Sequence, residues 1–185
     1  MNTYKLKVAG LERDLPICPV NEHLDIAAFV IFGDVELTEA CARELIKKMP
    51  PHDIMITAES KGIPLICSMA RILGENRYIL ARKGPKLYMR DVIECKTQSI
   101  TTAAKQTLYI DGDDAEYMKG KRVLVVDDVI STGESLHALC GLGCGEQLGQ
   151  HGKGHVLKSG GGAVEQLQYG EITYGNGGGQ ILYGE

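Results

Sequence analysis

The sequence has no tryptophan and only two phenylalanines among 185 residues, so aromatic surface for stacking on a ligand is scarce. It also lacks an excess of either charge, because 20 basic and 24 acidic residues give a net charge of −4. This balance provides no general attraction for nucleic acid or an anionic membrane. There is no apolar stretch of about 18 residues and no basic leader before an apolar segment. We therefore expect a cytoplasmic protein without a membrane span or a signal peptide.

The chain contains six cysteines, which we expect to be reduced because disulfides are rare in cytosolic proteins. Cys41 and Cys67 fall in segments of helical character beside alanine and isoleucine, and both thiols are predicted to be buried. The length of 185 residues suits a single domain with a substantial core.

The most informative pattern is the segment Val123-Leu-Val-Val-Asp-Asp-Val-Ile-Ser-Thr-Gly-Glu-Ser135. Its aliphatic start predicts a strand that is covered on both faces. Two carboxylates follow, Asp127 and Asp128, and then a turn of hydroxyl residues and glycine leads into a helix near Glu134. The free N–H groups of a helix's first turn bind anions, and carboxylates accept hydrogen bonds from sugar hydroxyls or face a magnesium ion. The alternative is an ordinary strand end whose acids cap a helix.

This segment resembles the ribose-phosphate binding signature of type I phosphoribosyltransferases, an aliphatic strand followed by Asp-Asp, two variable residues and Ser/Ala-Thr-Gly-x-Ser/Thr. The resemblance covers about residues 29–139 and implies an α/β fold, with a mainly parallel sheet flanked by helices and a flexible lid hairpin. It also implies that Asp127 and Asp128 hold the ribose hydroxyls of phosphoribosyl pyrophosphate (PRPP). The 5′-phosphate is then assigned to the turn, with Ser131, Thr132, Gly133, Glu134 and Ser135.

Strands and helices alternate along the chain before this segment. Helices are predicted from Thr38 or Glu39 to Lys48 and from Ile63 to Leu73, the second one closed by Gly74. Strands are predicted at 53–58, 77–82 and 122–127. In such a βαβ fold the ligand crevice lies at the carboxyl ends of the strands. The turns that follow these strands should therefore meet at one edge of the sheet: 59–62, 82–88 and 127–135.

Two basic segments lie at the predicted edge. The turn Glu59-Ser-Lys-Gly62 resembles the pyrophosphate loop of the same family, and its glycine would let the backbone approach an anion. The segment Leu80-Ala-Arg-Lys-Gly-Pro-Lys-Leu-Tyr88 resembles the Arg-Lys-x-x-Lys-Leu segment of adenine phosphoribosyltransferases. The resemblance assigns the pyrophosphate to Ser60, Lys61, Gly62, Arg82, Lys83 and Lys86. From the residues alone, a solvated charged turn and a basic strand end in water are alternatives.

The threonine-rich interval 89–107 predicts a flexible hairpin that acts as a lid. Adenine-specific members of the family carry a glutamate near the purine in this loop, and Glu94 is the nearest candidate for such a catalytic residue.

The segment Ala28-Phe-Val-Ile-Phe-Gly-Asp34 resembles the Phe-Arg-Asp segment that covers adenine in that subfamily, which assigns base binding to Phe32 and Asp34. Gly33 stands where the subfamily has arginine, which removes a planar cation able to stack on a purine. Core packing of Phe29 and Phe32 at positions i and i+3 is an equally good interpretation.

The resemblance ends near residue 140, and the composition changes there. Residues 141–185 hold 15 of the 23 glycines, and this segment is predicted to be a flexible or disordered tail behind a domain of residues 1–140. The tail is either a natural extension or the product of a changed coding frame, and we favour the frame change. Without a further strand and helix, one side of the sheet would be uncovered. A zinc-like set has too short a spacer, so no metal site is expected at His137, Cys140, Cys144, His151 and His155.

The sequence therefore predicts a phosphoribosyltransferase that uses PRPP and a purine-like base, in adenine-type salvage, and releases pyrophosphate. Asp127, Asp128 and Glu94 are its candidate catalytic residues. Mg²⁺ is expected to be bound mostly through the substrate's oxygens, and the protein is expected to be a homodimer. The alternative is a PRPP-sensing regulator that binds nucleic acid on the same fold.

Overall fold

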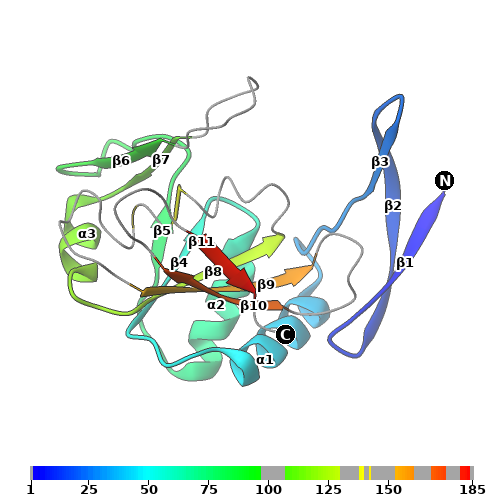
Figure 1. The fold of residues 1–185 in the computed structure, drawn as a ribbon, viewed down its shortest axis with the longest axis horizontal. Coiled ribbons are helices and arrows are strands. Elements are labelled where there is room, and N and C mark those ends of the chain that lie inside the picture. Colours follow the sequence, from blue (N-terminus) through cyan, green and yellow to red (C-terminus); the bar gives the residue numbers. More distant parts are fainter. Residues whose placement is uncertain are drawn as a thin grey trace.

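The computed structural model describes residues 2–96, 107–129, 138–139, 142, 153–160, 168–173 and 180–183. Within this part of the chain, a six-stranded sheet with the order β11-β10-β9-β8-β4-β5 forms the centre of the molecule (Figure 1). Strands β5, β4, β8 and β9 are parallel to one another, and β10 and β11 continue the sheet in antiparallel pairs. The strands are β4 (Ile54–Ala58), β5 (Ile79–Ala81), β8 (Val123–Val129), β9 (Lys153–Gly160), β10 (Gln168–Thr173) and β11 (Gln180–Tyr183). The predicted α/β fold with a mainly parallel sheet is confirmed.

Helices cover both faces of the sheet, as predicted. On one face, α1 (Val35–Lys48) and α2 (Gly62–Leu73) share a core with Leu124 and Val126 of β8. On the other face, α3 (Gly112–Met118) and the buried residues 138–139 and 142 pack with Val123 and Val125. Successive residues of a strand point to opposite faces, so the aliphatic run of β8 supplies both cores at once. Each fully buried aliphatic side chain contributes about 1.5–3 kcal/mol.

The ends of α1 and α2 depend on single residues. α1 begins at Val35, earlier than predicted, because Asp34 is its N-cap and accepts a hydrogen bond from the backbone N–H of Leu37 at 2.9 Å. The prediction of a start at Thr38 or Glu39 was wrong, since the Thr38 hydroxyl lies inside the helix and donates to the Asp34 carbonyl. α2 ends at Leu73 and is closed by Gly74, as predicted; the φ of 72° at Gly74 is the left-handed conformation that closes helices.

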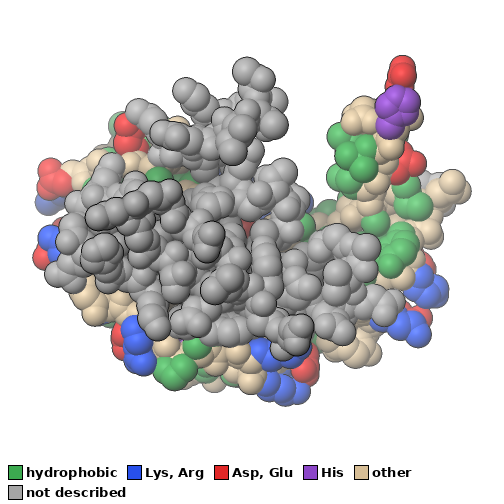
Figure 2. Space-filling model, viewed as in Figure 1, with side chains coloured by type: hydrophobic (Ala, Val, Ile, Leu, Met, Phe, Trp, Pro, Cys, Tyr) green, Lys and Arg blue, Asp and Glu red, His purple; other side chains and the backbone are tan. Residues whose placement is uncertain are grey.

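The amino-terminal residues form a separate antiparallel sheet, here called the arm, which stands beside the central body in Figure 1. Its strands are β1 (Thr3–Val8), β2 (Leu11–Asn21) and β3 (Leu24–Ala27). Ala9 and Gly10 join the first two strands with φ values of 51° and 78°, as a two-residue hairpin turn requires. Leu6 and Val8 are buried in the core beside α1, whereas β3 is exposed throughout. Figure 2 shows apolar side chains along the exposed part of the arm.

The predicted hairpin in the interval 89–107 is present at both of its described ends. β6 (Ile93–Lys96) pairs with β7 (Thr107–Ile110) in antiparallel register. Arg82 forms an isolated bridge with Tyr109, which joins this hairpin to the end of β5. The segment between the two strands lies outside the described residues, so its action as a lid stays a prediction.

The glycine-rich segment 141–185 contributes strands to the central sheet. β9 pairs in parallel with β8, and β10 and β11 follow it in antiparallel register. These strands differ from the expected flexible or disordered tail. The backbone hydrogen bonds of a sheet do not require large side chains, so glycine-rich segments can also form strands. The division of the chain at residue 140 and the frame-change hypothesis stay predictions.

Four cysteines lie among the described residues, and all four are free thiols: Cys18, Cys41, Cys67 and Cys95. Cys41 is buried as predicted, and its burial raises the pKa of the thiol to about 11. Cys67 is exposed, so its predicted burial was wrong: it lies on α2 between the buried residues Ile66 and Ser68 but faces outward. Among the residues that the structure describes, no helix has both the length and the apolar character needed to cross a membrane.

Candidate functional site

The carboxyl ends of β4, β5 and β8 meet at one edge of the sheet, as the sequence predicts. Ala58 at the end of β4 pairs with Ala81 at the end of β5. Ile56 pairs with Val125, and continuation of this parallel register places Ala58 level with Asp127. The turn 59–62, the basic segment 82–86 and the acid pair therefore follow neighbouring strand ends.

Asp127 and Asp128 lie near the end of β8, with only 9% and 5% of their surfaces exposed. The backbone N–H of Asp128 donates a hydrogen bond to Oδ1 of Asp127 at 2.9 Å. Burial, followed by the charge of Asp128, raises the pKa of Asp127 to about 7, and burial also raises the pKa of Asp128. The positive charge of Lys61 acts on both carboxyls in the opposite direction. Two adjacent buried acids with displaced pKa values are typical of a functional site.

The turn after β4 places Ser60 and Lys61 in solvent and buries Gly62 at the start of α2. The peptide bond between Glu59 and Ser60 is cis. A Cβ atom at Gly62 would collide with Oγ1 of Thr57 in β4. Glycine is therefore required here because the helix packs tightly on the sheet. The predicted role of Gly62 in the approach of an anion is a separate one and stays a prediction.

Glu59 joins this turn to the basic segment 82–86, a contact that the sequence analysis did not predict. Its carboxylate accepts a hydrogen bond from the backbone N–H of Lys83 at 3.0 Å and pairs with the Arg82 guanidinium at 3.4 Å. Its backbone N–H donates to the carbonyl of Ala81 at 2.8 Å. The hydrogen bond from Lys83, assisted by the positive charges of Arg82, Lys86 and Lys83, lowers the pKa of Glu59. The sequence does show an acidic residue, Glu59, directly after a predicted strand. It does not show which neighbouring strand end this carboxylate contacts.

The basic segment is held at both of its ends. The backbone N–H and carbonyl of Arg82 both bond to Tyr109 of β7, at 2.8 and 2.9 Å. The backbone N–H of Lys86 donates to Sδ of Met89 at 3.2 Å. Lys61 follows the end of β4, and Arg82, Lys83 and Lys86 follow the paired end of β5, so the four predicted pyrophosphate cations lie along one edge of the sheet.

The turn predicted to bind the 5′-phosphate, with Ser131, Thr132, Gly133, Glu134 and Ser135, lies outside the described residues. β8 extends to Val129, two residues beyond the predicted end of the strand, and Ala138 and Leu139 are helical and buried, in agreement with the predicted helix. Phosphate binding by the turn itself stays a prediction.

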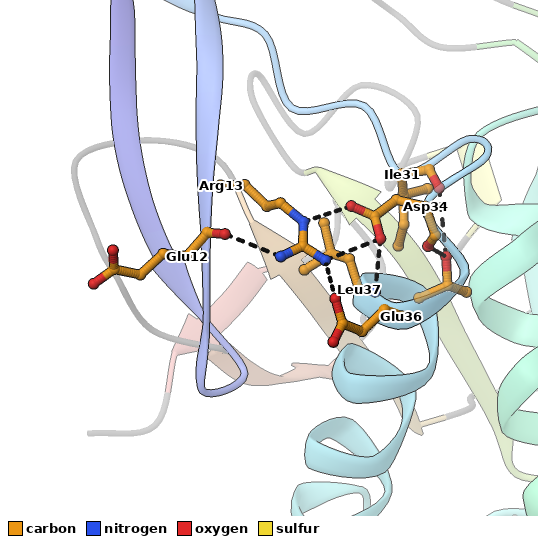
Figure 3. Close-up of polar contacts among 7 residues, drawn as sticks. Glu12, Arg13, Ile31, Asp34, Glu36 and Leu37 are labelled. Carbon is orange, nitrogen blue, oxygen red and sulfur yellow. Dashed lines mark hydrogen bonds and ion pairs between the residues drawn. The ribbon is translucent and has the colours of Figure 1, made fainter.

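Asp34 and Phe32, the predicted base-binding residues, have different surroundings. The Asp34 carboxylate accepts two hydrogen bonds from Arg13 of the arm, at 2.6 and 3.1 Å, besides the one from Leu37 (Figure 3). Arg13 also pairs with Glu36 at 2.7 Å, and its hydrogen bonds to Asp34 lower the pKa of that carboxyl. Asp34 thus fastens the arm to α1, and a base that needed this carboxylate would have to compete with Arg13.

The two phenylalanines do not share an environment. Phe29 is buried in the core, as the packing interpretation predicts, whereas 47% of the Phe32 surface is exposed. Glu94 is also exposed and lies in β6 opposite Tyr109 of β7. The roles of Phe32, Asp34 and Glu94 stay predictions.

A sequence model of the phosphoribosyl transferase domain matches residues 36–142. This match spans more than half of the chain and includes the three strand ends, the basic segment and the acid pair. The chain belongs to the phosphoribosyltransferase family. The members of this family are glycosyltransferases, so the predicted family, fold and enzyme class are confirmed.

Curated phosphoribosyltransferases resemble the chain in sequence. The hypoxanthine/guanine phosphoribosyltransferase of Methanotorris igneus is 30% identical over 138 residues, which cover 70% of this chain and 71% of that protein. The hypoxanthine-guanine phosphoribosyltransferase of Pan troglodytes is 29% identical over 136 residues, which cover 72% of this chain and 62% of that protein.

Solved phosphoribosyltransferase structures share the fold. The adenine phosphoribosyltransferase of Thermoanaerobacter pseudethanolicus superimposes with a TM-score of 0.57 at 19% identity, over 69% of this chain and 74% of that one. The Saccharomyces cerevisiae adenine phosphoribosyltransferase, solved with adenine and an imino-altritol bisphosphate, has a TM-score of 0.54 at 22% identity, over 72% and 77% of the two chains.

Among the described residues, no group of three or more His, Cys, Asp or Glu side chains is arranged to hold a metal ion. The zinc-like set of the sequence falls almost wholly elsewhere, because only the backbone of His155 is described, in β9. The other four members lie outside the described residues: His137, Cys140, Cys144 and His151.

Proposed function

We propose that the protein transfers the phosphoribosyl group of PRPP to a nitrogen of a purine base and releases pyrophosphate. The observation that carries this proposal is the buried Asp127–Asp128 pair at the carboxyl end of β8, in a chain of the phosphoribosyltransferase family. Two acids buried side by side oppose folding, and hydrogen bonds from a polyhydroxyl ligand would offset that cost.

In this reaction the bond from ribose C1 to the pyrophosphate oxygen breaks, and its electron pair leaves with pyrophosphate. A base nitrogen forms the new bond to C1 and loses its proton to solvent. Positive charge develops on the sugar between the two events, so the protein acts mainly by positioning the reactants and by electrostatics. Asp127 and Asp128 accept hydrogen bonds from the ribose hydroxyls and place negative charge beside the ring.

The leaving pyrophosphate is assigned to the cationic edge and the 5′-phosphate to the turn after β8. Ser60, Lys61 and Gly62 provide the first part of the pyrophosphate site, and the second part comes from Arg82, Lys83 and Lys86. The four cations at this edge support the assignment, because the leaving group gains negative charge as its bond breaks.

A magnesium ion fits this chemistry, since carboxylates are hard oxygen donors and Mg²⁺ keeps substrate oxygens and waters in its shell. Asp127 and Asp128 are the carboxylates that would face such a PRPP-bound ion. When bound, the ion would neutralise part of the pyrophosphate charge.

The acceptor base is proposed at the level of a purine. The resemblance of residues 28–34 and 80–88 favours adenine, whereas the curated relatives at about 30% identity are named for hypoxanthine and guanine. Phe32, Asp34 and Glu94 are the proposed base contacts.

A cytoplasmic homodimer completes the proposal. The arm exposes three apolar residues that support self-association: Val20, Leu24 and Ile26. Sedimentation of the full chain tests whether it forms a dimer.

The proposal is tested by pyrophosphate release from PRPP and Mg²⁺ with hypoxanthine, guanine, adenine, a pyrimidine or no base. Release that requires one of the purines supports it. If PRPP binds but no base supports release, the PRPP-sensing regulator replaces the enzyme as the better account.

A further inference from the structure

Glu59 is an acid that contacts the basic segment of the predicted pyrophosphate site, at Arg82 and Lys83. Its side chain is three-quarters buried, with 24% exposed, and the partnering Arg82 side chain is equally buried. It bonds to the backbone of Lys83 and to the side chain of Arg82, so it binds the basic segment at two points. A backbone hydrogen bond and an ion pair from one carboxylate constrain the segment more than a single surface ion pair does.

Electrostatics alone would make Glu59 unfavourable in an anion site. Its negative charge lies among cations that should attract pyrophosphate, and it lowers their combined field. A carboxylate at this position favours pyrophosphate binding only if its alignment of the cations outweighs its repulsion of the anion.

We infer that Glu59 is a positioning residue for the pyrophosphate half of the site, where its carboxylate aligns Lys83 and Arg82 with Lys61 on the neighbouring turn. This inference rests on the proposed function, because it needs the cationic edge to be the place where pyrophosphate binds. Lys61 lies only two residues beyond Glu59 in the same turn, so one carboxylate connects the cations of two strand ends.

The chain contains a matched contact at the other end of β4. Asp53 precedes the strand, accepts the backbone N–H of Arg122 at 2.8 Å and binds its guanidinium at 2.9 and 2.8 Å. Both acids thus join a flanking residue of β4 to a neighbouring strand through one backbone and one guanidinium contact. Of the two, Glu59 lies at the carboxyl end of β4 and Asp53 at the amino end, so Asp53 serves as the structural control.

The experiment measures calorimetric binding of magnesium pyrophosphate and of ribose 5-phosphate to the full-length wild type, Glu59→Ala, Glu59→Gln and Asp53→Ala. Loss of one charged hydrogen bond in Glu59→Ala should weaken pyrophosphate binding on the order of tenfold, with ribose 5-phosphate binding changed by less than about twofold. Glu59→Gln should lose less, because its amide oxygen still accepts the N–H of Lys83. Asp53→Ala should lower the melting temperature but change neither affinity by more than about twofold.

Several results would overturn the inference. Tighter pyrophosphate binding in Glu59→Ala would mean that charge, not position, is its main effect. An equal loss for both ligands, or the same selective loss in Asp53→Ala, would reduce Glu59 to a structural residue. If Glu59→Ala does not fold, Glu59→Gln decides, because unchanged pyrophosphate binding in that variant after loss of its contact with Arg82 would contradict the role.

Binding does not depend on turnover. A wild type that binds pyrophosphate but releases none from PRPP would therefore contradict the proposed function and leave this comparison valid.

Discussion

Asp53, at the amino end of β4, and the pair Asp127 and Asp128, at the carboxyl end of β8, have opposite environments. At the amino ends of β4 and β8, the half-exposed Asp53 meets Arg122 through three hydrogen bonds, and these lower the pKa of its carboxyl. At the carboxyl ends, Asp127 and Asp128 are buried beside each other, and their pKa values are raised. The contacts of Asp53 stabilise its charged form, whereas the burial of Asp127 and Asp128 destabilises theirs.

This difference has opposite consequences for stability as pH changes. The contribution of Asp53 is present above its unfolded pKa and is lost as pH falls, because protonation breaks its contacts with Arg122. The contribution of Asp127 is greatest at low pH and declines as pH rises from about 4 through about 7, since the folded protein then loses a proton that burial had retained. The acid pair, unlike Asp53, thus lowers stability near neutral pH, as expected where a ligand provides the missing interactions.

The largest expected effect comes from removal of both charges at that edge. Asp127→Asn with Asp128→Asn should lower pyrophosphate release on the order of a thousandfold, because the ribose loses both anionic acceptors. Circular dichroism should show an intact fold, since asparagine has the same shape. Asp53→Asn serves as the control and should keep wild-type turnover. An active double variant would exclude the acid pair from the reaction.

A smaller effect is expected where the turn packs on the sheet. Gly62→Ala should destabilise the protein by roughly 1–3 kcal/mol, because the added methyl group meets Thr57. Gly84→Ala is the matched control, since a Cβ atom there has no neighbour within 4 Å. Urea unfolding of both variants measures the difference. Equal stability of the two variants would show that the start of α2 can shift without cost.

The single change Asp127→Asn tests the cost of burial directly. It should raise stability at pH 8 by roughly 1–2 kcal/mol and have little effect at pH 4, where the wild-type carboxyl is protonated. The readout is urea unfolding at the two pH values. A loss of stability at pH 8 would mean that the charged carboxylate is well satisfied without a ligand.

The smallest effect is expected at the opposite edge. Asp53→Asn removes a half-exposed charge, so the melting temperature should fall only slightly, and the fall should diminish in high salt. Thermal unfolding in low and high salt checks this prediction. A large loss that salt does not reduce would indicate a role of Asp53 beyond its ion pair.

The fold and the main site could be predicted because local patterns encode them. The aliphatic run before Asp127 predicts a buried strand. A glycine that follows a helical segment commonly closes the helix, as Gly74 does here. The order of strands and helices then determines which turns share an edge of the sheet. Lys61 and Lys83 could therefore be assigned to the same edge from the sequence.

Contacts between distant segments could not be predicted in the same way. Glu59 and Asp53 are both acids beside one strand, and only the strand order shows which partner each reaches. The alternation from Tyr4 to Val8 and the turn at Gly10 do signal the first hairpin of the arm, but not that Arg13 would reach Asp34. The strands of the glycine-rich segment had no such signal, because glycine is depleted in strands.

The most direct test of the central claim is product stoichiometry. Purified full-length protein should convert PRPP and one purine base into equal amounts of pyrophosphate and the purine nucleoside 5′-monophosphate, measured by mass spectrometry and a coupled pyrophosphate assay. Pyrophosphate without nucleotide, or neither product with any purine, would contradict the assignment of phosphoribosyl transfer to this edge of the sheet.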